Sequence, residues 1–302
     1  MCLSEIMKVI DLFAGCGGLS LGFQQAGFEI LAGFDNWQAA ITVYQRNFNH
    51  PIINIDIAKL DDFSIFQNYL PDVIIGGPPC QDFSSAGKRK EEARADLTIK
   101  FAEIIAMVRP KYFVMENVDR ITTTQALRKA IDIFKFHGYG LTPKVLNAAL
   151  CGVPQLRKRF FLIGTLGTAD NVLAYFLDKN LTNKPLTIFE YLGSSLEIEH
   201  YYRHPRSYSR RAVFSIYEPS PTIRGVNRPI PKNYQFHPGD TSKEMKNLRP
   251  LTTVERAYLQ TFPKDFQWEN VNKSDLEQMI GNAVPVKLAK FVASNLLEYS
   301  VC

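Results

Sequence analysis

The sequence lacks any unbroken apolar run long enough to cross a lipid bilayer, so we expect no membrane-spanning helix and no membrane partner. Its first residues, MCLSEIMKVIDLFAG, also lack the basic start, apolar segment and cleavage site of a secretory signal. A hydrophobic content of 46% with 22% charged residues is ordinary for a soluble globular protein. We therefore expect a cytoplasmic protein whose 302 residues suffice for a large core and a second module.

Cysteine is scarce, odd in number and scattered along the chain. No CxxC spacing occurs, which argues against both a disulfide framework and a zinc site. We expect the thiols to be reduced and no metal to be bound. The five cysteines are Cys2, Cys16, Cys80, Cys151 and Cys302.

A strong overall charge is also missing, but the charge is unevenly distributed. The net charge is +5, yet residues 201–250 contain ten Lys and Arg against three Asp and Glu, which leaves −2 for the remainder. From about 185 to 250 the chain is rich in Pro, Tyr, Arg and Ser, with no sustained helical period. This pattern predicts an irregular, basic module suited to binding nucleic acid.

The first half alternates short apolar runs with longer amphipathic ones, which predicts an α/β fold with a doubly wound, Rossmann-like sheet of parallel strands. The pairs are KVIDLFA and LSLGFQQAG, EILAGFD and WQAAITVYQRNF, DVIIGG and LTIKFAEIIAMVRP, YFVMENV and TQALRKAIDIFKFHG. RFFLIGT, at 159–165, is a later strand. Thr252 and Glu255 predict a capped helix, and PVKLAKFVASNLLEY a final helix that packs back on the first part.

Three features follow successive predicted strands, where ligands of such sheets bind. A turn with Gly15, Gly17 and Gly18 precedes a helix and lets the backbone approach a ligand, although a tight connection is an equal explanation. Asp35 and Asp56 could accept hydrogen bonds from a ribose and an adenine amino group, or be loop acids or helix caps. Together they favour a nucleoside-containing cofactor.

The stretch GGPPCQDFSSAG, at 76–87, places Cys80 behind two prolines at the end of a strand. Glu116 ends a strand expected nearby, so its carboxyl group could face the thiol across one cleft. A cysteine thiolate is a nucleophile, and a carboxyl group beside it could manage a proton. Taken separately, Cys80 could be a small buried hydrophobe and Glu116 a helix cap.

Six blocks resemble, in order and over nearly the whole chain, the DNA cytosine-5 methyltransferases that use S-adenosyl-L-methionine. The resemblance implies a catalytic domain of residues 1–186 plus 276–302, and a smaller target-recognition domain of residues 187–275. The blocks are DLFAGCGGLSLGF, GGPPCQDFS, MENV, NAALCGVPQLRKRFFLIG, LTTVERAYLQTFP and GNAVPVKLA.

The resemblance implies that Cys80 attacks C6 of the target cytosine while Glu116 engages N3 and the exocyclic amine. C5 then accepts the methyl group, and loss of the C5 proton releases the enzyme. Elementary chemistry agrees, because C5 is a poor nucleophile until a covalent bond at C6 makes it enamine-like. Arg157 and Arg159, alternate residues near the start of a strand, are implied to point into the active site, although a basic edge strand would explain them in isolation.

The resemblance also implies which residues contact the cofactor and its product, S-adenosyl-L-homocysteine. The family usually has glutamate where Asp35 stands, but the shorter acid should still reach the ribose. The implied contacts are Phe13, Ala14, Gly15, Gly17, Gly18, Asp35, Asn36, Asp56, Ile57, Pro78, Leu97, Asn282 and Ala283.

The implied substrate is double-stranded DNA. Because the chemistry needs both faces of the base, the target base must flip out of the helix. Residues 88–97 correspond to a mobile loop that closes over DNA, and SPTIRG, at 220–225, to a supporting segment of the recognition domain. We expect a monomeric modification enzyme of a restriction-modification system, with a cognate restriction endonuclease as a candidate partner. The candidate DNA contacts are Ser84, Lys88, Arg94, Arg203, Arg206, Arg210, Arg211, Arg224 and Arg228.

Three alternatives remain open at this point. A transfer-RNA cytosine-5 methyltransferase would have the same architecture. A catalytically silent DNA-binding module would keep the fold, although Cys80, Glu116, Arg157 and Arg159 are all present. A nicotinamide oxidoreductase would explain the first glycine turn, but not Cys80 together with Glu116.

Overall fold

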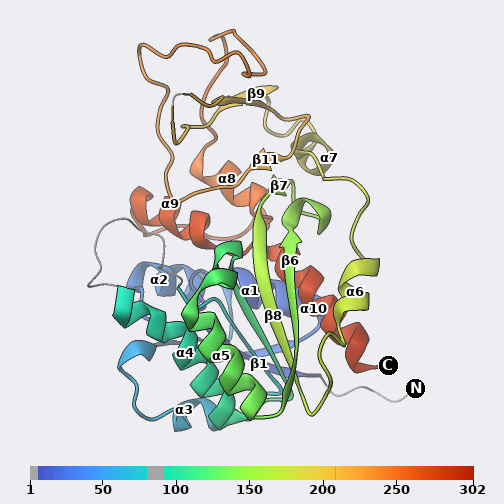
Figure 1. Ribbon diagram of the computed structural model, residues 1–302. Coiled ribbons are helices and arrows are strands. Elements are labelled where there is room, and N and C mark those ends of the chain that lie inside the picture. The colour runs from blue at the N-terminus through green and yellow to red at the C-terminus, as the bar shows by residue number, and fades with distance from the viewer. Residues whose placement is uncertain (1–5, 80–90, 208) are drawn as a thin grey trace.

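The computed structural model describes residues 6–79, 91–207 and 209–302, with side chains from residue 97 onward in the helix that begins at Glu91. Its main element is a seven-stranded sheet with the order β3-β2-β1-β4-β5-β8-β6 (Figure 1). The strands are β1 (Lys8–Leu12), β2 (Glu29–Asp35), β3 (Ile52–Asn54), β4 (Val73–Gly76), β5 (Tyr112–Val118), β6 (Tyr139–Asn147) and β8 (Lys158–Leu166).

Helices cover both faces of this sheet, because successive strand residues point to opposite faces and both are apolar. Val9 and Val114 pack with one group of helices, whereas their neighbours Ile10 and Phe113 pack with the other. The predicted α/β fold is therefore confirmed. The first group is α1 (Gly18–Ala26), α6 (Ala174–Lys179) and α10 (Val286–Ser300), and the second is α3 (Ser64–Gln67), α4 (Glu91–Val108) and α5 (Gln125–Phe136).

The parallel strands predicted for the first half are confirmed, whereas the later strand, for which no direction was predicted, runs the other way. Strands β3, β2, β1, β4 and β5 are parallel, but β8 runs antiparallel between β5 and β6. Strand β6 was not predicted; it contains Pro143, which an edge strand tolerates. The predicted loop at 88–97 also differs, since α4 already begins at Glu91, within a run of strong helix formers.

The C-terminal helix packs back on the first part of the chain, as predicted. A Cβ atom added to Gly22 of α1 would lie 2.4 Å from the Cβ of Ala289 of α10, so these two helices are in direct contact. The predicted cap is also confirmed. Thr252 and Glu255 form a capping box at the start of α8 (Thr253–Leu259).

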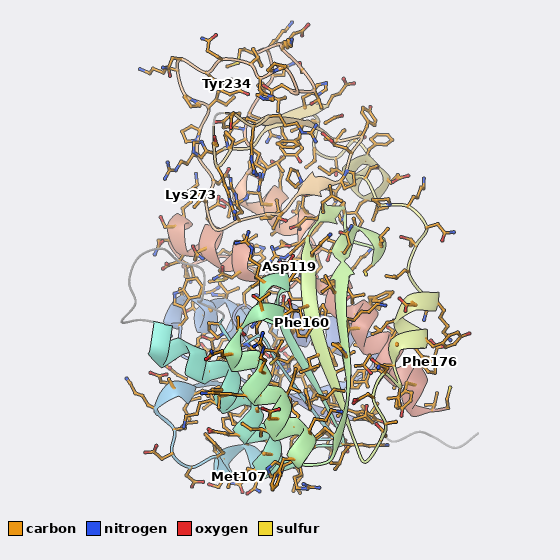
Figure 2. All side chains as sticks on the ribbon, in the orientation of Figure 1. Met107, Asp119, Phe160, Phe176, Tyr234 and Lys273 are labelled. Atoms are coloured by element: carbon orange, nitrogen blue, oxygen red, sulfur yellow. The ribbon has the colours of Figure 1, made fainter. Side chains whose placement is uncertain are left out.

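The second part of the chain consists of short elements and long connections, and it lies at the end of the sheet opposite Met107 (Figure 2). A hydrophobic cluster continues into it from α2 (Gln38–Asn47), joining Ile41 to Tyr201 and Phe214. The domain boundary at residue 187 stays a prediction. The elements are β7 (Gln155–Leu156), α7 (Ile188–Leu192), β9 (His200–Tyr202), β10 (Val213–Ser215), β11 (Ser220–Pro221) and α9 (Lys273–Asn282).

In the described part of the chain, none of the helices combines the length and the apolar composition that crossing a membrane requires.

A buried polar chain ties β1 to α1 and α2. The Asp11 carboxylate accepts hydrogen bonds from the Ser20 backbone N–H, at 3.2 Å, and from the Ser20 hydroxyl, at 2.6 Å. The same hydroxyl lies 2.7 Å from the Tyr44 hydroxyl, which lies 2.7 Å from Nε2 of His50. Burial raises the pKa of Asp11 to about 7, although the bonds from Ser20 oppose this.

We predict that Asp11→Asn flattens the pH dependence of stability. Because the folded pKa lies above the ordinary value of 3.8, stability from the neutral carboxyl is present below about pH 4 and is lost as pH rises towards 7. The difference corresponds to about 4 kcal/mol of unfolding free energy. Urea denaturation at pH 4 and pH 8 measures it. The exposed variant Asp265→Asn should keep the wild-type slope, and an equal slope for Asp11→Asn would contradict the assignment.

Candidate active site

A cavity of about 520 Å³ opens at the carboxyl ends of the parallel strands. Its wall includes the connections that follow β1, β2, β3 and β4, together with the last residues of β5 and the end of α9. Twelve of the predicted cofactor contacts line it: Phe13, Ala14, Gly15, Gly18, Asp35, Asn36, Asp56, Ile57, Pro78, Leu97, Asn282 and Ala283.

Gly17 is the predicted contact that does not line this cavity. It lies in the left-handed region with φ 88°, and a Cβ atom there would lie 2.3 Å from the ring of Phe48. Its role is therefore to turn the backbone against Phe48. Gly18 lines the cavity, and a Cβ atom on it would lie 2.3 Å from the Val284 carbonyl oxygen.

The two predicted cofactor acids line the cavity, and both also accept hydrogen bonds from backbone N–H groups. Asp35 accepts hydrogen bonds from the N–H groups of Gly15 and Trp37, each at 2.8 Å, and burial raises its pKa. Asp56 accepts from the Ala58 N–H at 3.2 Å and caps a short 3₁₀ helix, Ile57–Lys59. Both carboxylates still have lone pairs that a ligand could use.

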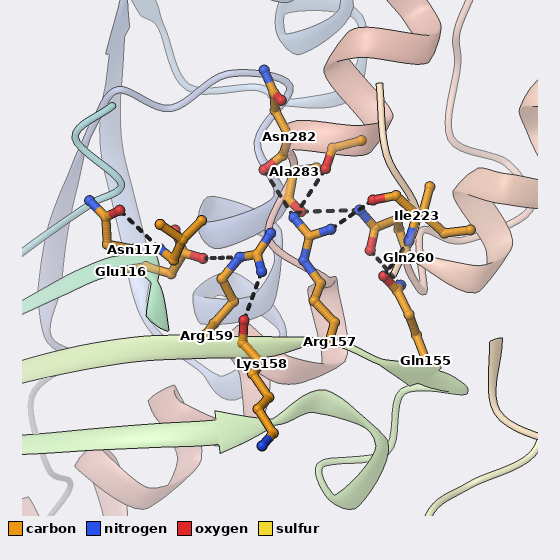
Figure 3. Close-up of polar contacts among 12 residues, drawn as sticks. Glu116, Asn117, Gln155, Arg157, Lys158, Arg159, Ile223, Gln260, Asn282 and Ala283 are labelled. Atoms are coloured by element: carbon orange, nitrogen blue, oxygen red, sulfur yellow. Dashed lines mark hydrogen bonds and ion pairs between the residues drawn. The ribbon is translucent and has the colours of Figure 1, made fainter. Parts of the chain in front are cut away.

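Glu116, at the end of β5, faces the connection that leads to Cys80. A Cβ atom on Gly77 would lie 3.2 Å from Oε2 of Glu116, and Asn117 donates to the Pro78 carbonyl at 2.8 Å. Arg159 Nε lies 3.0 Å from Glu116 Oε1 (Figure 3). Burial raises the pKa of Glu116, while Arg159 and Arg157 pull it down.

Arg157 occupies a different place from the predicted one. Its side chain is fully buried beside the cavity instead of lining it. The guanidinium donates hydrogen bonds to the carbonyl oxygens of Ile223, at 3.0 Å, and of Gly281 and Ala283, each at 3.1 Å (Figure 3). The structure therefore separates the two arginines: Arg159 faces Glu116, and Arg157 faces backbone.

Several predicted site residues lie outside the described residues. They are Cys80, Ser84 and Lys88, and the side chain of Arg94.

The predicted DNA-contacting arginines of the second part fall into two groups. Arg203 donates to the Thr222 carbonyl at 2.7 Å, Arg224 donates to the His204 carbonyl, and Arg211 pairs with Glu218 at 2.7 Å. Burial, followed by repulsion from Arg224, lowers the pKa of Arg203 to about 10. The second group is exposed and makes no ion pair with acids of the described residues: Arg206, Arg210 and Arg228.

Several residues of the cavity wall were not found from the sequence. Trp37, Asn117 and Gln278 all line it. A half-buried tryptophan two residues after the acid that ends β2 was an available signal, as was an amide next to Glu116. Gln278 lies on α9 and gave no sequence signal. No group of three or more His, Cys, Asp and Glu that could hold a metal occurs within residues 6–79, 91–207 and 209–302.

Comparisons with known proteins agree with this geometry. The sequence model of C-5 cytosine-specific DNA methylases matches residues 7–298. Type II methyltransferase M.HindV of Haemophilus influenzae is 57% identical over 296 residues, covering 97% of each chain. Type II methyltransferase M.HgiDI of Herpetosiphon aurantiacus is 54% identical over 295 residues, covering 97% of this chain and 95% of the relative.

A solved structure adds a likeness of fold. The structure of S. pombe Dnmt2 methyltransferase matches with a TM-score of 0.73 over 97% of this chain and 99% of that chain, at 18% identity. The family match spans both the sheet and the second part of the chain, including every block that carried the resemblance in the sequence. The chain belongs to the family of C-5 cytosine-specific DNA methylases.

Proposed function

We propose that this enzyme transfers a methyl group from S-adenosyl-L-methionine to C5 of a flipped-out cytosine in a specific duplex DNA site, through a covalent bond between Cys80 and C6. The observation that carries the proposal is the position of Glu116. It shares one cavity with the predicted cofactor contacts, pairs with Arg159, and faces the connection that immediately precedes Cys80.

The cavity fits this cofactor in size and charge. Its volume of about 520 Å³ is in the range of small-molecule sites. Its wall contains three acids, Asp35, Asp56 and Glu116, but Arg159 is the only Lys or Arg among the described residues that line it. S-adenosyl-L-methionine carries a methyl group on a positively charged sulfur, which such a wall favours. A nicotinamide dinucleotide carries an anionic pyrophosphate, which this wall disfavours.

Glu116 and Arg159 have different roles towards the cytosine in this proposal. Burial raises the pKa of Glu116 and so favours its protonated carboxyl group, which can donate to N3 while its other oxygen accepts from the exocyclic amine. The ion pair with Arg159 limits the rise in the pKa of Glu116 and keeps its carboxyl group oriented. Withdrawal of electrons towards N3 makes C6 open to attack.

Cys80 supplies the nucleophile in this proposal. Its thiolate forms the S–C6 bond, and the displaced electron pair makes C5 a carbon nucleophile. C5 accepts the methyl group, the C5 proton is then lost to a base, and the returning electrons break the S–C6 bond. The free thiolate and 5-methylcytosine result, so atoms and charge balance over the cycle.

The relatives support a role in DNA modification. Because M.HindV and M.HgiDI are named Type II methyltransferases and match along nearly their whole length, we assign this enzyme the same role. It would act as a cytoplasmic monomer that protects a site from a cognate endonuclease. The exposed arginines Arg206, Arg210 and Arg228 are the best candidates for DNA contacts, because no described acid neutralises them.

We predict methyl transfer to duplex DNA and none to transfer RNA. Incubation of the enzyme with tritiated S-adenosyl-L-methionine and each nucleic acid measures this directly. Cys80→Ser should abolish transfer and covalent trapping on 5-fluorocytosine DNA, while cofactor binding in calorimetry is kept. Methylated product on RNA alone would contradict the assignment of DNA as the substrate. Normal turnover by Cys80→Ser would contradict the assignment of Cys80 as the nucleophile.

We predict that Glu116→Gln lowers the rate of methyl transfer by more than about a hundredfold, because an amide can make the same two hydrogen bonds but cannot transfer a proton to N3. The affinity for S-adenosyl-L-homocysteine should stay within about twofold of wild type. Asp119→Asn is the matched control, since it makes the same change on an exposed acid three residues later. Equal rates for the two variants would remove Glu116 from the reaction.

We predict that Arg206→Ala and Arg228→Ala each weaken DNA binding and reduce the slope of log Kd against log salt by about 1. Arg211→Ala should leave that slope unchanged, because Glu218 already neutralises Arg211. Fluorescence anisotropy on a labelled duplex across a salt series gives all three slopes. A lower slope for Arg211→Ala with unchanged slopes for the other two would reverse the assignment.

A further inference from the structure

Two backbone segments of different function cross in direct contact. One is 220–225, the predicted support of the recognition domain, and the other is the end of α9, which enters the cavity wall. A Cβ atom on Gly281 would lie 2.2 Å from the backbone nitrogen of Gly225 and 2.3 Å from the carbonyl carbon of Arg224. These atoms are backbone, so they cannot swing aside as a flexible side chain can. The crossing therefore requires glycine at 281.

Arg157 lies at this crossing and bonds to both segments. Its guanidinium donates to Ile223 O at 3.0 Å on one side, and to Gly281 O and Ala283 O at 3.1 Å on the other, with Asn282 O at 3.5 Å (Figure 3). The side chain is fully buried. Because a buried donor or carbonyl without a partner is costly, neither segment can move away from Arg157 without loss of these bonds.

Two buried amide side chains fix the same arrangement. Gln155 accepts a hydrogen bond from the Ile223 N–H at 2.8 Å and donates to Gln260 Oε1 at 2.8 Å. Gln260 in turn donates to Ala283 O at 3.1 Å. Ile223 is thus held at its N–H by Gln155 and at its carbonyl by Arg157, which sets the position of segment 220–225 along the crossing.

The residues of this network are next to the cofactor cavity, to Glu116 and to the predicted recognition domain. Asn282 and Ala283 line the cofactor cavity. Burial, followed by repulsion from the exposed Arg206, lowers the pKa of Arg224, the residue after Ile223. Arg159, two residues after Arg157, pairs with Glu116. The network therefore joins the cofactor wall, the catalytic acid and the recognition domain.

We infer that Arg157 is a positioning residue that sets the cofactor wall and the recognition segment in one fixed arrangement, so that cofactor affinity and selection of the DNA site depend on the same bonds. This inference rests on the proposed function. Arg157 touches neither the cytosine nor the cofactor in this role; it acts through the carbonyl groups of Ile223, Gly281 and Ala283.

Two variants of the full chain test it from different sides. Arg157→Lys keeps the charge but loses the planar fork that reaches several carbonyls. Gly281→Ala keeps Arg157 but forces the crossing backbones apart. For Arg157→Lys we expect the calorimetric Kd of S-adenosyl-L-homocysteine to rise about tenfold. For both variants, bisulfite sequencing of a treated plasmid should show methylation spreading from the wild-type sequence context to related contexts.

Asn295→Ala is the matched control. Asn295 is a buried amide of α10 that bonds to Asn180 and to the Phe291 carbonyl, away from the crossing. It should lower Tm without changing the affinity for S-adenosyl-L-homocysteine or the methylated context, with all proteins compared well below their Tm values.

The outcomes separate this inference from the proposed function. If Arg157→Lys and Gly281→Ala lower Tm as Asn295→Ala does but keep the wild-type context, Arg157 is a structural bond only and the inference is wrong. A change of affinity in Arg157→Lys without a change of context also overturns it, because the two must move together. A wild-type enzyme that binds S-adenosyl-L-homocysteine but methylates no DNA would overturn the proposed function instead.

Discussion

Burial of three charged side chains at one end of the sheet is the constraint on which the rest of the structure depends. Glu116 is 8% exposed and Arg157 is 0% exposed, and the side chain of Arg159 is 14% exposed. Removing such groups from water costs on the order of several kcal/mol each unless partners replace the solvent. Arg159 and Glu116 satisfy each other. Among the described residues, Arg157 has carbonyl groups of distant segments and no carboxylate as hydrogen-bond partners, so the chain must bring residues 223 and 281–283 to it.

The direction of β8 makes this arrangement possible. In a parallel sheet every strand ends at the ligand edge, and the residues at the start of a strand lie at the opposite edge. Because β8 runs antiparallel, its first residues lie beside the last residues of β5, and Arg159 pairs in register with Val118. Val118 and Glu116 are two residues apart and point to the same face, so Arg159 reaches the carboxylate. The antiparallel direction of β8 is therefore what brings Arg159 to Glu116.

The sequence predicted those features that depend on local pattern. Strands β2 and β5 begin and end at the predicted residues, and the Thr252 cap forms as its spacing required. The direction of β8 was beyond such reasoning, because alternation of apolar residues reads the same along either direction of a strand. Pro143 concealed β6, since proline is rare within strands. In contrast, the hydrogen-bond partners of a polar side chain depend on where it lies in the folded chain.

The candidate site illustrates this limit. Spacing placed Asp35, Asp56 and Glu116 at one edge, where they are found. The two arginines of QLRKR looked equivalent in the sequence, yet Arg159 meets a carboxylate and Arg157 meets only backbone. The partners of Arg157 are Ile223 and Gly281, which lie 66 and 124 positions further along the chain. No local sequence pattern shows that these residues come close to it.

The same distinction changes what the basic composition of the second part means. Its charge of +7 over 201–250 counts every arginine equally. Arg211 is neutralised by Glu218, and the fork of Arg203 is bonded to backbone, so much of that charge is used to hold a module with few regular elements. Where strands are three residues or shorter, the backbone lacks a ladder to satisfy its carbonyl groups, and arginine forks supply donors in its place. In the proposed function, the charge left for a phosphate backbone lies on exposed side chains that pair with no described acid, among them Arg206, Arg228 and Lys232. Affinity for DNA and stability of this part of the chain would then rest on different side chains.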